Sequence, residues 1–245
     1  MNLVIDIGNT LAKIAVFKNK KLQSVVKTES ASFKKKLGRE LGRPEIKSVI
    51  LSSVIRTKPD LIRLIKTKPL FFIRLSHLTP MPIKIKYNTP HTLGNDRIAN
   101  AVAACNLFPG KNILVIDTGT CLKFDFVDAK KNYLGGSISP GLNMRYKALH
   151  FYTQKLPLLS PSKKIVLTGR TTKESILSGV QNGMTQEING VINQYKKKYK
   201  NLIVVLTGGE SGFFANHLKN SIFAAPNFTL TGLNEILNYN ALHYA

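Results

Sequence analysis

Short apolar runs separated by polar turns dominate the start of the chain. The runs at 3–8, 11–17 and 21–29 have β-type patterns divided by the turns GNT and KNKK, which predicts a three-stranded antiparallel meander. The elements predicted next are a basic helix at about 32–42, a buried strand at 47–54, a helix at 59–66 beginning with Pro59, a strand at 70–75, a proline-rich loop or edge segment at 76–94, and an alanine-rich helix at about 95–107. This mixture indicates an α/β fold.

The same order of elements begins again in the second half. Apparent strands at 112–119, 121–128 and 132–139 form a second meander, and helices and a further strand follow. Thr171 and Glu174 have capping-box spacing at the start of a long amphipathic helix, after which come a buried strand at 201–210 and a terminal helix at 232–242. The repeat predicts two domains, 1–110 and 111–245, with the terminal helix able to cross back to the first.

One motif occurs in both halves. Shifting DIGNTLAK by 111 positions onto DTGTCLKF superimposes Asp6 on Asp117, Gly8 on Gly119 and Asn9 on Thr120. Glycine after a strand lets backbone N–H groups approach a ligand, and a neighbouring hydroxyl adds a donor, so such turns suit phosphate oxygens. A single turn of this kind is usually an ordinary β-turn. Two in register, with a third strand-to-glycine turn at 207–209, favour a phosphate site.

Charge and composition narrow the function classes. The 245 residues include 36 Lys and Arg against 13 Asp and Glu, a net charge of +23 that attracts anions. The lysines are dispersed and no RNP-like, zinc-finger or arginine-rich segment accompanies them, so we interpret the surplus as a solvated lysine surface and expect no nucleic-acid partner. Two cysteines without paired spacing indicate neither a disulfide framework nor a zinc site. No 18-residue apolar window occurs, so we expect a cytoplasmic protein without a membrane partner.

Two common nucleotide-binding motifs are missing. The sequence has no GxxxxGK[ST] loop and no GxGxxG opening a helix after a strand. A P-loop or dinucleotide-binding site is therefore not predicted.

Six motifs in a fixed order carry a family resemblance. DIGNTLAK, YNTPHTLGNDR (87–97), DTGTCLKFD (117–125), GGSISPG (135–141), TTKESILSG (171–179) and LTGGE (206–210) together resemble type III pantothenate kinase over nearly the whole chain. The resemblance implies an α/β fold of two ribonuclease H-like domains, each a mixed five-stranded sheet flanked by helices, with a cleft between them. It also implies ATP-dependent phosphorylation of pantothenate to 4'-phosphopantothenate, the first committed step of coenzyme A biosynthesis.

The resemblance also implies roles for individual residues. The predicted ATP-binding residues are Asp6, Ile7, Gly8, Asn9, Thr10, Leu11, Ala12, Lys13, Thr120, Gly208 and Gly209. The predicted pantothenate-binding residues are Tyr87, Gly94, Asn95, Asp96, Arg97 and Thr172, with Asp96 as the proton acceptor. Asp117 would hold a monovalent cation, K⁺ or NH₄⁺, and Asp6 could bind Mg²⁺ through water. The family is dimeric with pantothenate near the interface, a role that suits the alanine-rich helix.

Several alternatives stay open at this level. Asp96 could only cap its helix, Arg97 could be a surface cation, Tyr87 could pack in a core, Thr172 could belong to a cap alone, and Lys13 could be solvated. Lys123 departs from the usual family pattern and either adds a positive charge near the phosphates or points outward, while Glu210 replaces the usual Asp.

The alternative functions are a non-catalytic, DNA-associated or regulatory paralogue, and another phosphotransferase or polyphosphate hydrolase on the same fold.

Overall fold

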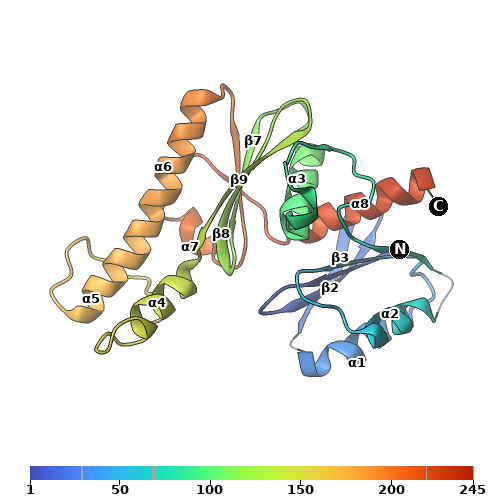
Figure 1. Ribbon diagram of the computed structural model, residues 1–245, viewed down its shortest axis with the longest axis horizontal. Coiled ribbons are helices and arrows are strands. Elements are labelled where there is room, and N and C mark those ends of the chain that lie inside the picture. The colour runs from blue at the N-terminus through green and yellow to red at the C-terminus, as the bar shows by residue number, and fades with distance from the viewer. Residues whose placement is uncertain (29, 68–69, 219, 245) are drawn as a thin grey trace. The chain divides into compact units, whose positions relative to one another are not determined.

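The computed structural model describes residues 1–28, 30–67, 70–218 and 220–244, and the chain divides into two compact units (Figure 1). Unit 1 comprises Met1–Pro109, Lys131–Leu134 and Asn227–Ala245, and unit 2 comprises Gly110–Lys130 and Gly135–Pro226. Every helix in the described residues is too short or too polar to cross a lipid bilayer.

Unit 1 is built on a five-stranded mixed sheet with the order β3-β2-β1-β4-β5. The strands are β1 (Asn2–Ile7), β2 (Ala12–Lys18), β3 (Lys21–Thr28), β4 (Ser48–Ser53) and β5 (Phe71–Arg74). The first three form the predicted antiparallel meander, and β4 and β5 continue the sheet in parallel from β1. Parallel addition requires a crossover on each side of β4, and the helices α1 (Ser30–Leu41) and α2 (Pro59–Lys66) provide it.

Alternation along the strands separates the two faces of this sheet. Leu3, Ile5 and Val49 lie on one face in a core with Leu61 and Ile65 of α2, and residues of α1 complete that core. Helix α8 (Phe228–Tyr244) contacts β1 and β4 and also packs along α3 (Asn95–Leu107).

The helix pair α3 and α8 explains the alanine-rich sequence of α3. A Cβ atom on Gly232 of α8 would lie 1.8 Å from the carbonyl oxygen of Ala99, a distance that no side chain could occupy. Ala99, Ala101, Ala103 and Ala104 are all buried. The small side chains are therefore used to bring α8 close within one chain, and they offer no free surface to a second subunit.

Unit 2 repeats the strand order of unit 1. Its strands are β7 (Ile113–Thr118), β8 (Cys121–Val127), β9 (Asn132–Pro140), β10 (Ile203–Thr207) and β11 (Phe223–Ala224), in the order β11-β10-β7-β8-β9. As in unit 1, the first hairpin is antiparallel and the later strands are parallel to its first strand. The first residues of β9, counted with unit 1, pair with the short strand β6 (Lys84–Ile85), which makes this sheet six-stranded where five strands were predicted. A 3₁₀ turn (Pro90–Thr92) follows β6.

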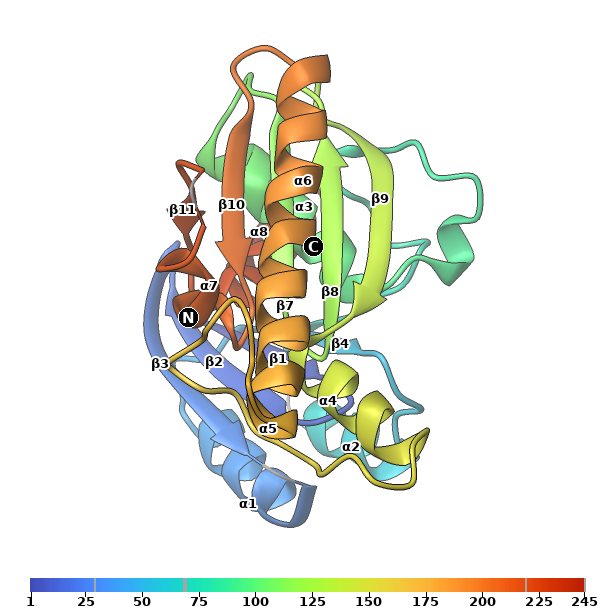
Figure 2. The same ribbon diagram turned by 90° about the vertical axis from the view of Figure 1, so that its left-hand side faces the viewer.

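Helices cover one face of the unit 2 sheet. They are α4 (Leu142–Phe151), α5 (Thr172–Leu177), the π-helical turn η2 (Ser178–Asn182), α6 (Gly183–Lys198) and α7 (Ser211–Ala215). Met184, Ile188 and Ile192 of α6 join Leu114 and Ile116 of β7 in one core, and Figure 2 shows α6 running along these strands.

The long helix predicted from Thr171 is present and contains one π-helical turn. The predicted cap is present, because the hydroxyl of Thr171 accepts a hydrogen bond from the Glu174 N–H at 3.2 Å. The π-helical turn η2 joins α5 to α6, and within it Gln181 is fully buried. Its side-chain oxygen accepts bonds from Tyr146 Oη at 2.8 Å and Ser162 N at 3.0 Å. These partners lie far from Gln181 in the sequence, so local periodicity could not predict the π-helical turn.

Candidate active site

The first glycine turn joins β1 to β2. The Gly8 N–H donates to the Leu11 carbonyl at 3.1 Å, which closes the turn and leaves Asn9, Thr10 and Leu11 exposed at its tip. Asp6, at the end of β1, accepts a hydrogen bond from Ser52 Oγ at 3.1 Å and lies opposite Lys13 in the strand register. The tip of the turn thus exposes backbone groups and the Thr10 hydroxyl, next to the Asp6 carboxylate that Ser52 holds in place.

This turn forms one wall of a cavity of about 620 Å³ within unit 1. The lining residues are Ile7, Gly8, Asn9, Thr10, Leu11, Ala12, Thr28, Phe33, Lys34, Ser53, Ile55, Arg56, Thr57, Lys58, Asp60 and Leu61. Lys34, Arg56 and Lys58 outnumber the single acidic residue, Asp60, so the cavity favours an anionic ligand.

The basic residues of this cavity were not among the predicted site residues. Arg56 and Lys58 follow β4, the strand parallel to β1, and the carboxyl ends of parallel neighbours lie at one edge of a sheet. A sequence signal was therefore available, namely basic residues directly after the buried strand 47–54. It was weak because the whole chain is rich in lysine.

The predicted pantothenate residues of unit 1 lie together at the start of α3. Asp96 is in the first turn of α3, and its Oδ1 accepts the Arg97 N–H at 2.9 Å. A Cβ on Gly94 would lie 2.7 Å from Asp96 Oδ1, so this carboxylate position requires glycine there. The positive end of the helix dipole stabilises a negative charge at this site.

Arg97 and Tyr87 complete this group. Arg97 is 5% exposed, which excludes the surface-cation alternative, and its guanidinium carbon lies 5.9 Å from the centre of the Tyr87 ring. Tyr87 also packs against Tyr133, with the ring centres 6.1 Å apart. Asn95 donates weakly to the Leu75 carbonyl at 3.4 Å. The cluster therefore combines a carboxylate, a guanidinium and a phenol, which suits a small polar substrate with a hydroxyl and a carboxylate.

The second glycine turn joins β7 to β8 in unit 2, beside the glycine turn after β10. Thr207 pairs with Asp117 in the parallel register of β10 and β7, and Thr118 Oγ1 donates to the Thr207 carbonyl at 2.9 Å. Gly208 has φ of +100°, and a Cβ there would lie 2.5 Å from the Thr118 carbonyl carbon and 2.6 Å from Asp117 Oδ1. Gly209 has open space around it, and Thr120 is exposed. Four predicted residues of unit 2 thus meet at one sheet edge: Asp117, Thr120, Gly208 and Gly209.

Lys123 lies against the carboxylate predicted to hold a monovalent cation. Its Nζ is 2.7 Å from Asp117 Oδ2, and the two side chains are 13% and 10% exposed. The strand register places these residues directly opposite each other on β8 and β7. Of the two roles left open for Lys123, the structure supports the positive charge near Asp117 and excludes the outward orientation.

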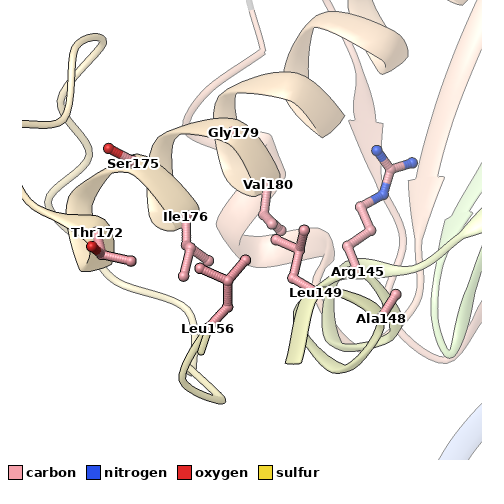
Figure 3. A pocket seen from close by; sticks show the side chains of 9 residues that line it. All are labelled: Arg145, Ala148, Leu149, Leu156, Thr172, Ser175, Ile176, Gly179 and Val180. Atoms are coloured by element: carbon pink, nitrogen blue, oxygen red, sulfur yellow. The ribbon is translucent and has the colours of Figure 1, made fainter. Parts of the chain in front are cut away.

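Thr172 lies elsewhere in unit 2, at one end of a pocket of about 590 Å³ (Figure 3). The side chains of Leu149, Leu156, Ile176 and Val180 form its apolar middle, and Arg145 lies at the other end. Arg145 was not predicted, and its guanidinium is already bound to Glu187, Ser139 Oγ and the Pro140 carbonyl. Burial raises the pKa of Tyr146 to about 12, so this tyrosine stays neutral and donates its hydrogen bond to Gln181.

Protein ligands for a divalent metal do not gather in the described residues, where no group of three or more His, Cys, Asp and Glu side chains is found. Asp6 is a single carboxylate beside a turn. A Mg²⁺ ion that arrives with a nucleotide needs only one or two protein carboxylates, because phosphate oxygens and water supply its other ligands.

The duplicated strand order and the glycine turns define a fold class, a two-unit α/β fold in which each unit has a mixed sheet with the same strand order. Solved structures share this fold across the chain. A Campylobacter jejuni protein described as a Baf family transcriptional activator has a TM-score of 0.63 at 19% identity, covering 98% of this chain and 99% of its own. A 2-hydroxyisocaproyl-CoA dehydratase activator from Clostridium difficile, with bound ADPNP, has a TM-score of 0.51 at 16% identity, covering 97% and 93%.

Sequence comparison then gives the family. The model of the type III pantothenate kinase family matches residues 2–194. A type III pantothenate kinase from Christiangramia forsetii is 46% identical over 98% of this chain and 99% of its own length. Another, from Cytophaga hutchinsonii, is 47% identical over 98% and 100%. The chain belongs to the type III pantothenate kinase family.

Proposed function

We propose that the turns and the Asp96 cluster described above are the working parts of a pantothenate kinase. The family makes the chain a phosphotransferase that phosphorylates pantothenate with ATP for coenzyme A biosynthesis. The main support for assigning roles to individual residues is the cluster at the start of α3, where Asp96, Arg97 and Tyr87 lie together.

Asp96 accepts the proton in this proposal. The hydroxyl oxygen of pantothenate forms a bond to the γ-phosphorus of ATP, the bond from that phosphorus to the leaving oxygen of ADP breaks, and the hydroxyl proton passes to the Asp96 carboxylate. Phosphoryl transfer depends mainly on positioning and charge neutralisation, so a carboxylate is a sufficient base when the proton leaves late. Arg97 offers a cation for the pantothenate carboxylate, and Tyr87 orients the guanidinium from its ring face.

ATP is held by the glycine turns in this proposal. The β1–β2 turn and the basic cavity beside it suit a polyphosphate, since backbone N–H groups, a threonine hydroxyl and three cations are available. Gly208, Gly209 and Thr120 supply the corresponding parts of unit 2. Mg²⁺ would neutralise phosphate charge and would be bound through water at Asp6. A monovalent cation at Asp117 remains a prediction, and Lys123 competes for the same carboxylate.

The first test is an ADP-release assay with a panel of vitamins and sugars. We expect ATP-dependent release with pantothenate and only background release with the other compounds, because the Asp96 cluster combines a base with a site for a carboxylate. The assay is coupled to NADH oxidation, and the product is identified by mass. A flat response across the panel together with tight, salt-sensitive DNA binding would contradict the proposal and favour the regulatory alternative.

We propose further that the protein is a homodimer. Unit 2 exposes several large apolar side chains that a monomer would leave in water: Ile138, Phe151, Tyr152, Leu158 and Leu167. The alanines of α3 do not support the dimer, since α8 already covers them.

Sedimentation equilibrium tests the dimer. We expect a mass of twice 27.2 kDa for the unmodified chain and a shift toward the monomer for Phe151→Asp, because a charge would be buried in the interface. Lys197→Asp, at an exposed position of α6 in the same unit and outside this apolar segment, is the control and should stay dimeric. A monomer at all concentrations would exclude the dimer.

Two further proposals concern domains and compartment. We propose that units 1 and 2 correspond to the two ribonuclease H-like domains, an idea supported by their common strand order.

We propose the cytoplasm as the compartment, which the two free cysteines support.

A further inference from the structure

The pair Asp117 and Lys123 is unusual for a surface turn because both side chains are largely buried. The ammonium nitrogen lies 2.7 Å from Asp117 Oδ2, a distance typical of a charge-assisted hydrogen bond. Both side chains lie on the sheet face opposite the helix-covered core, since their strand neighbours Ile116, Leu122 and Phe124 belong to that core. The ion pair between Asp117 and Lys123 therefore lies outside the core that the helices cover, beside the turn that joins β7 to β8.

The other oxygen of Asp117 faces backbone. Positions 119 and 208 are both glycine, and a Cβ would lie 3.1 Å or 2.6 Å from Asp117 Oδ1 at these positions. The carboxylate is thus enclosed by two glycine turns and one lysine. A buried carboxylate without a cation costs several kcal/mol, so a positive charge at this position is required for the turns to keep their shape.

A monovalent cation and a lysine ammonium satisfy the same requirement. Each carries one positive charge, and the ammonium group of lysine is chemically close to NH₄⁺. The lysine has the advantage of being attached to β8, because no ion has to be recruited from solution. A K⁺ ion at Asp117 would have to displace the Lys123 ammonium from Oδ2, so the residues present do not fit the predicted ion.

We infer that the Lys123 ammonium takes the place of the monovalent cation at Asp117, so that this kinase needs no added K⁺ or NH₄⁺. The inference rests on the proposed role of the Asp117 turn in ATP binding. It extends that role, because it names the residue that supplies the charge. Lys123 is a positioning residue here: it holds the carboxylate between the glycine turns and leaves the reacting atoms to other groups.

The first experiment compares turnover of the unmodified enzyme in tetramethylammonium chloride with turnover in KCl or NH₄Cl at equal ionic strength. We expect equal rates within about twofold, a difference well under 1 kcal/mol. Stimulation by K⁺ or NH₄⁺ of about tenfold or more would overturn the inference while leaving the kinase assignment intact. Absence of turnover in every salt would instead count against the proposed function.

The second experiment uses Lys123→Ala, which removes the ammonium and leaves space beside Asp117. We expect turnover in tetramethylammonium to fall about 10²-fold, because the buried Asp117 carboxylate loses its counter-charge and no longer holds the glycine turns in place, and we expect K⁺ or NH₄⁺ to restore most of it. Lys123→Arg should keep its turnover without K⁺, since it keeps a cation near Asp117. Lys111→Ala, an exposed lysine of the same unit, is the matched control and should behave as the unmodified enzyme.

Thermal unfolding gives a readout that does not depend on activity. K⁺ should raise the Tm of Lys123→Ala above its value in tetramethylammonium, since an ion that binds only the folded state stabilises it. The unmodified chain and Lys111→Ala should show no such K⁺-specific rise. A K⁺-specific rise in the unmodified chain, or none in a folded Lys123→Ala protein, would contradict the inference. If Lys123→Ala does not fold, the inference is tested on the unmodified chain alone, by the salt dependence of its turnover and of its Tm.

Discussion

Replacing Asp96 with Asn is expected to lower kcat by about 10²- to 10⁴-fold, or roughly 3 to 5 kcal/mol, the range for loss of a general base. The amide oxygen of Asn can still accept the Arg97 N–H that Asp96 Oδ1 accepts at 2.9 Å, so the start of α3 should keep its structure. The KM for ATP should change little, because Asp96 is assigned to the other substrate. Steady-state kinetics with pantothenate and ATP varied in turn measures both parameters.

The control for Asp96→Asn is Asp128→Asn. Asp128 Oδ1 also accepts a backbone N–H, that of Lys130 at 2.8 Å, but Asp128 belongs to neither glycine turn nor to the α3 cluster. Its replacement should leave kcat unchanged. If Asp96→Asn kept near-normal turnover with an unchanged melting temperature, Asp96 would not be the proton acceptor, and Asp117 would become the next carboxylate to test.

Replacing Gly208 with Ala is expected to have the largest effect on stability among the site residues. Its φ of +100° strains any residue with a Cβ, at about 1 to 3 kcal/mol. The new methyl would lie 2.5 Å from the Thr118 carbonyl carbon, and such overpacking costs about 1 to 3 kcal/mol more. The free energy of unfolding should therefore fall by about 2 to 6 kcal/mol, as measured by urea titration.

Gly209 is a matched control because it is the next residue and its Cβ would meet nothing within 4 Å. Gly209→Ala should unfold within about 0.5 kcal/mol of the unmodified chain, as surface substitutions usually do. In a folded Gly208→Ala preparation at low temperature, we expect weaker ATP binding, since the methyl would also press on Asp117 Oδ1 at 2.6 Å. Equal stability of the two variants would show that the turn after β10 is not tightly enclosed.

Much of the candidate site could be predicted from the sequence, because a glycine turn is determined by a few neighbouring residues. The chain must reverse direction after the apolar runs 3–8 and 112–119, and the residues that permit a tight turn lie within a few positions of each run. The start of α3 was predicted at the correct residue for a similar reason, since the three prolines of the preceding segment do not allow a continuous α-helix there. Asp96 could therefore be placed at a helix N-terminus without any structure.

Local sequence patterns did not show that Lys13 and Lys123 occupy equivalent positions, each opposite the aspartate of its own hairpin. A shift of 111 positions aligns Lys13 with Phe124, not with Lys123. In the structure Lys13 faces Asp6 and Lys123 faces Asp117, because the β1–β2 connection is one residue longer than the β7–β8 connection. Strand register depends on how the turn closes, and one residue changes which side chains lie opposite each other.

The sequence by itself determined the order of the longer strands and helices, the repeated motif and the glycine turns, since periodicity and backbone freedom act over a few residues. Only the tertiary structure decided that Lys123 neutralises Asp117, that Arg97 is buried beside Tyr87, and that α8 covers the alanines of α3. The physical reason is the same in each case: which distant side chains share one low-dielectric space is set by strand register and by the packing of whole elements.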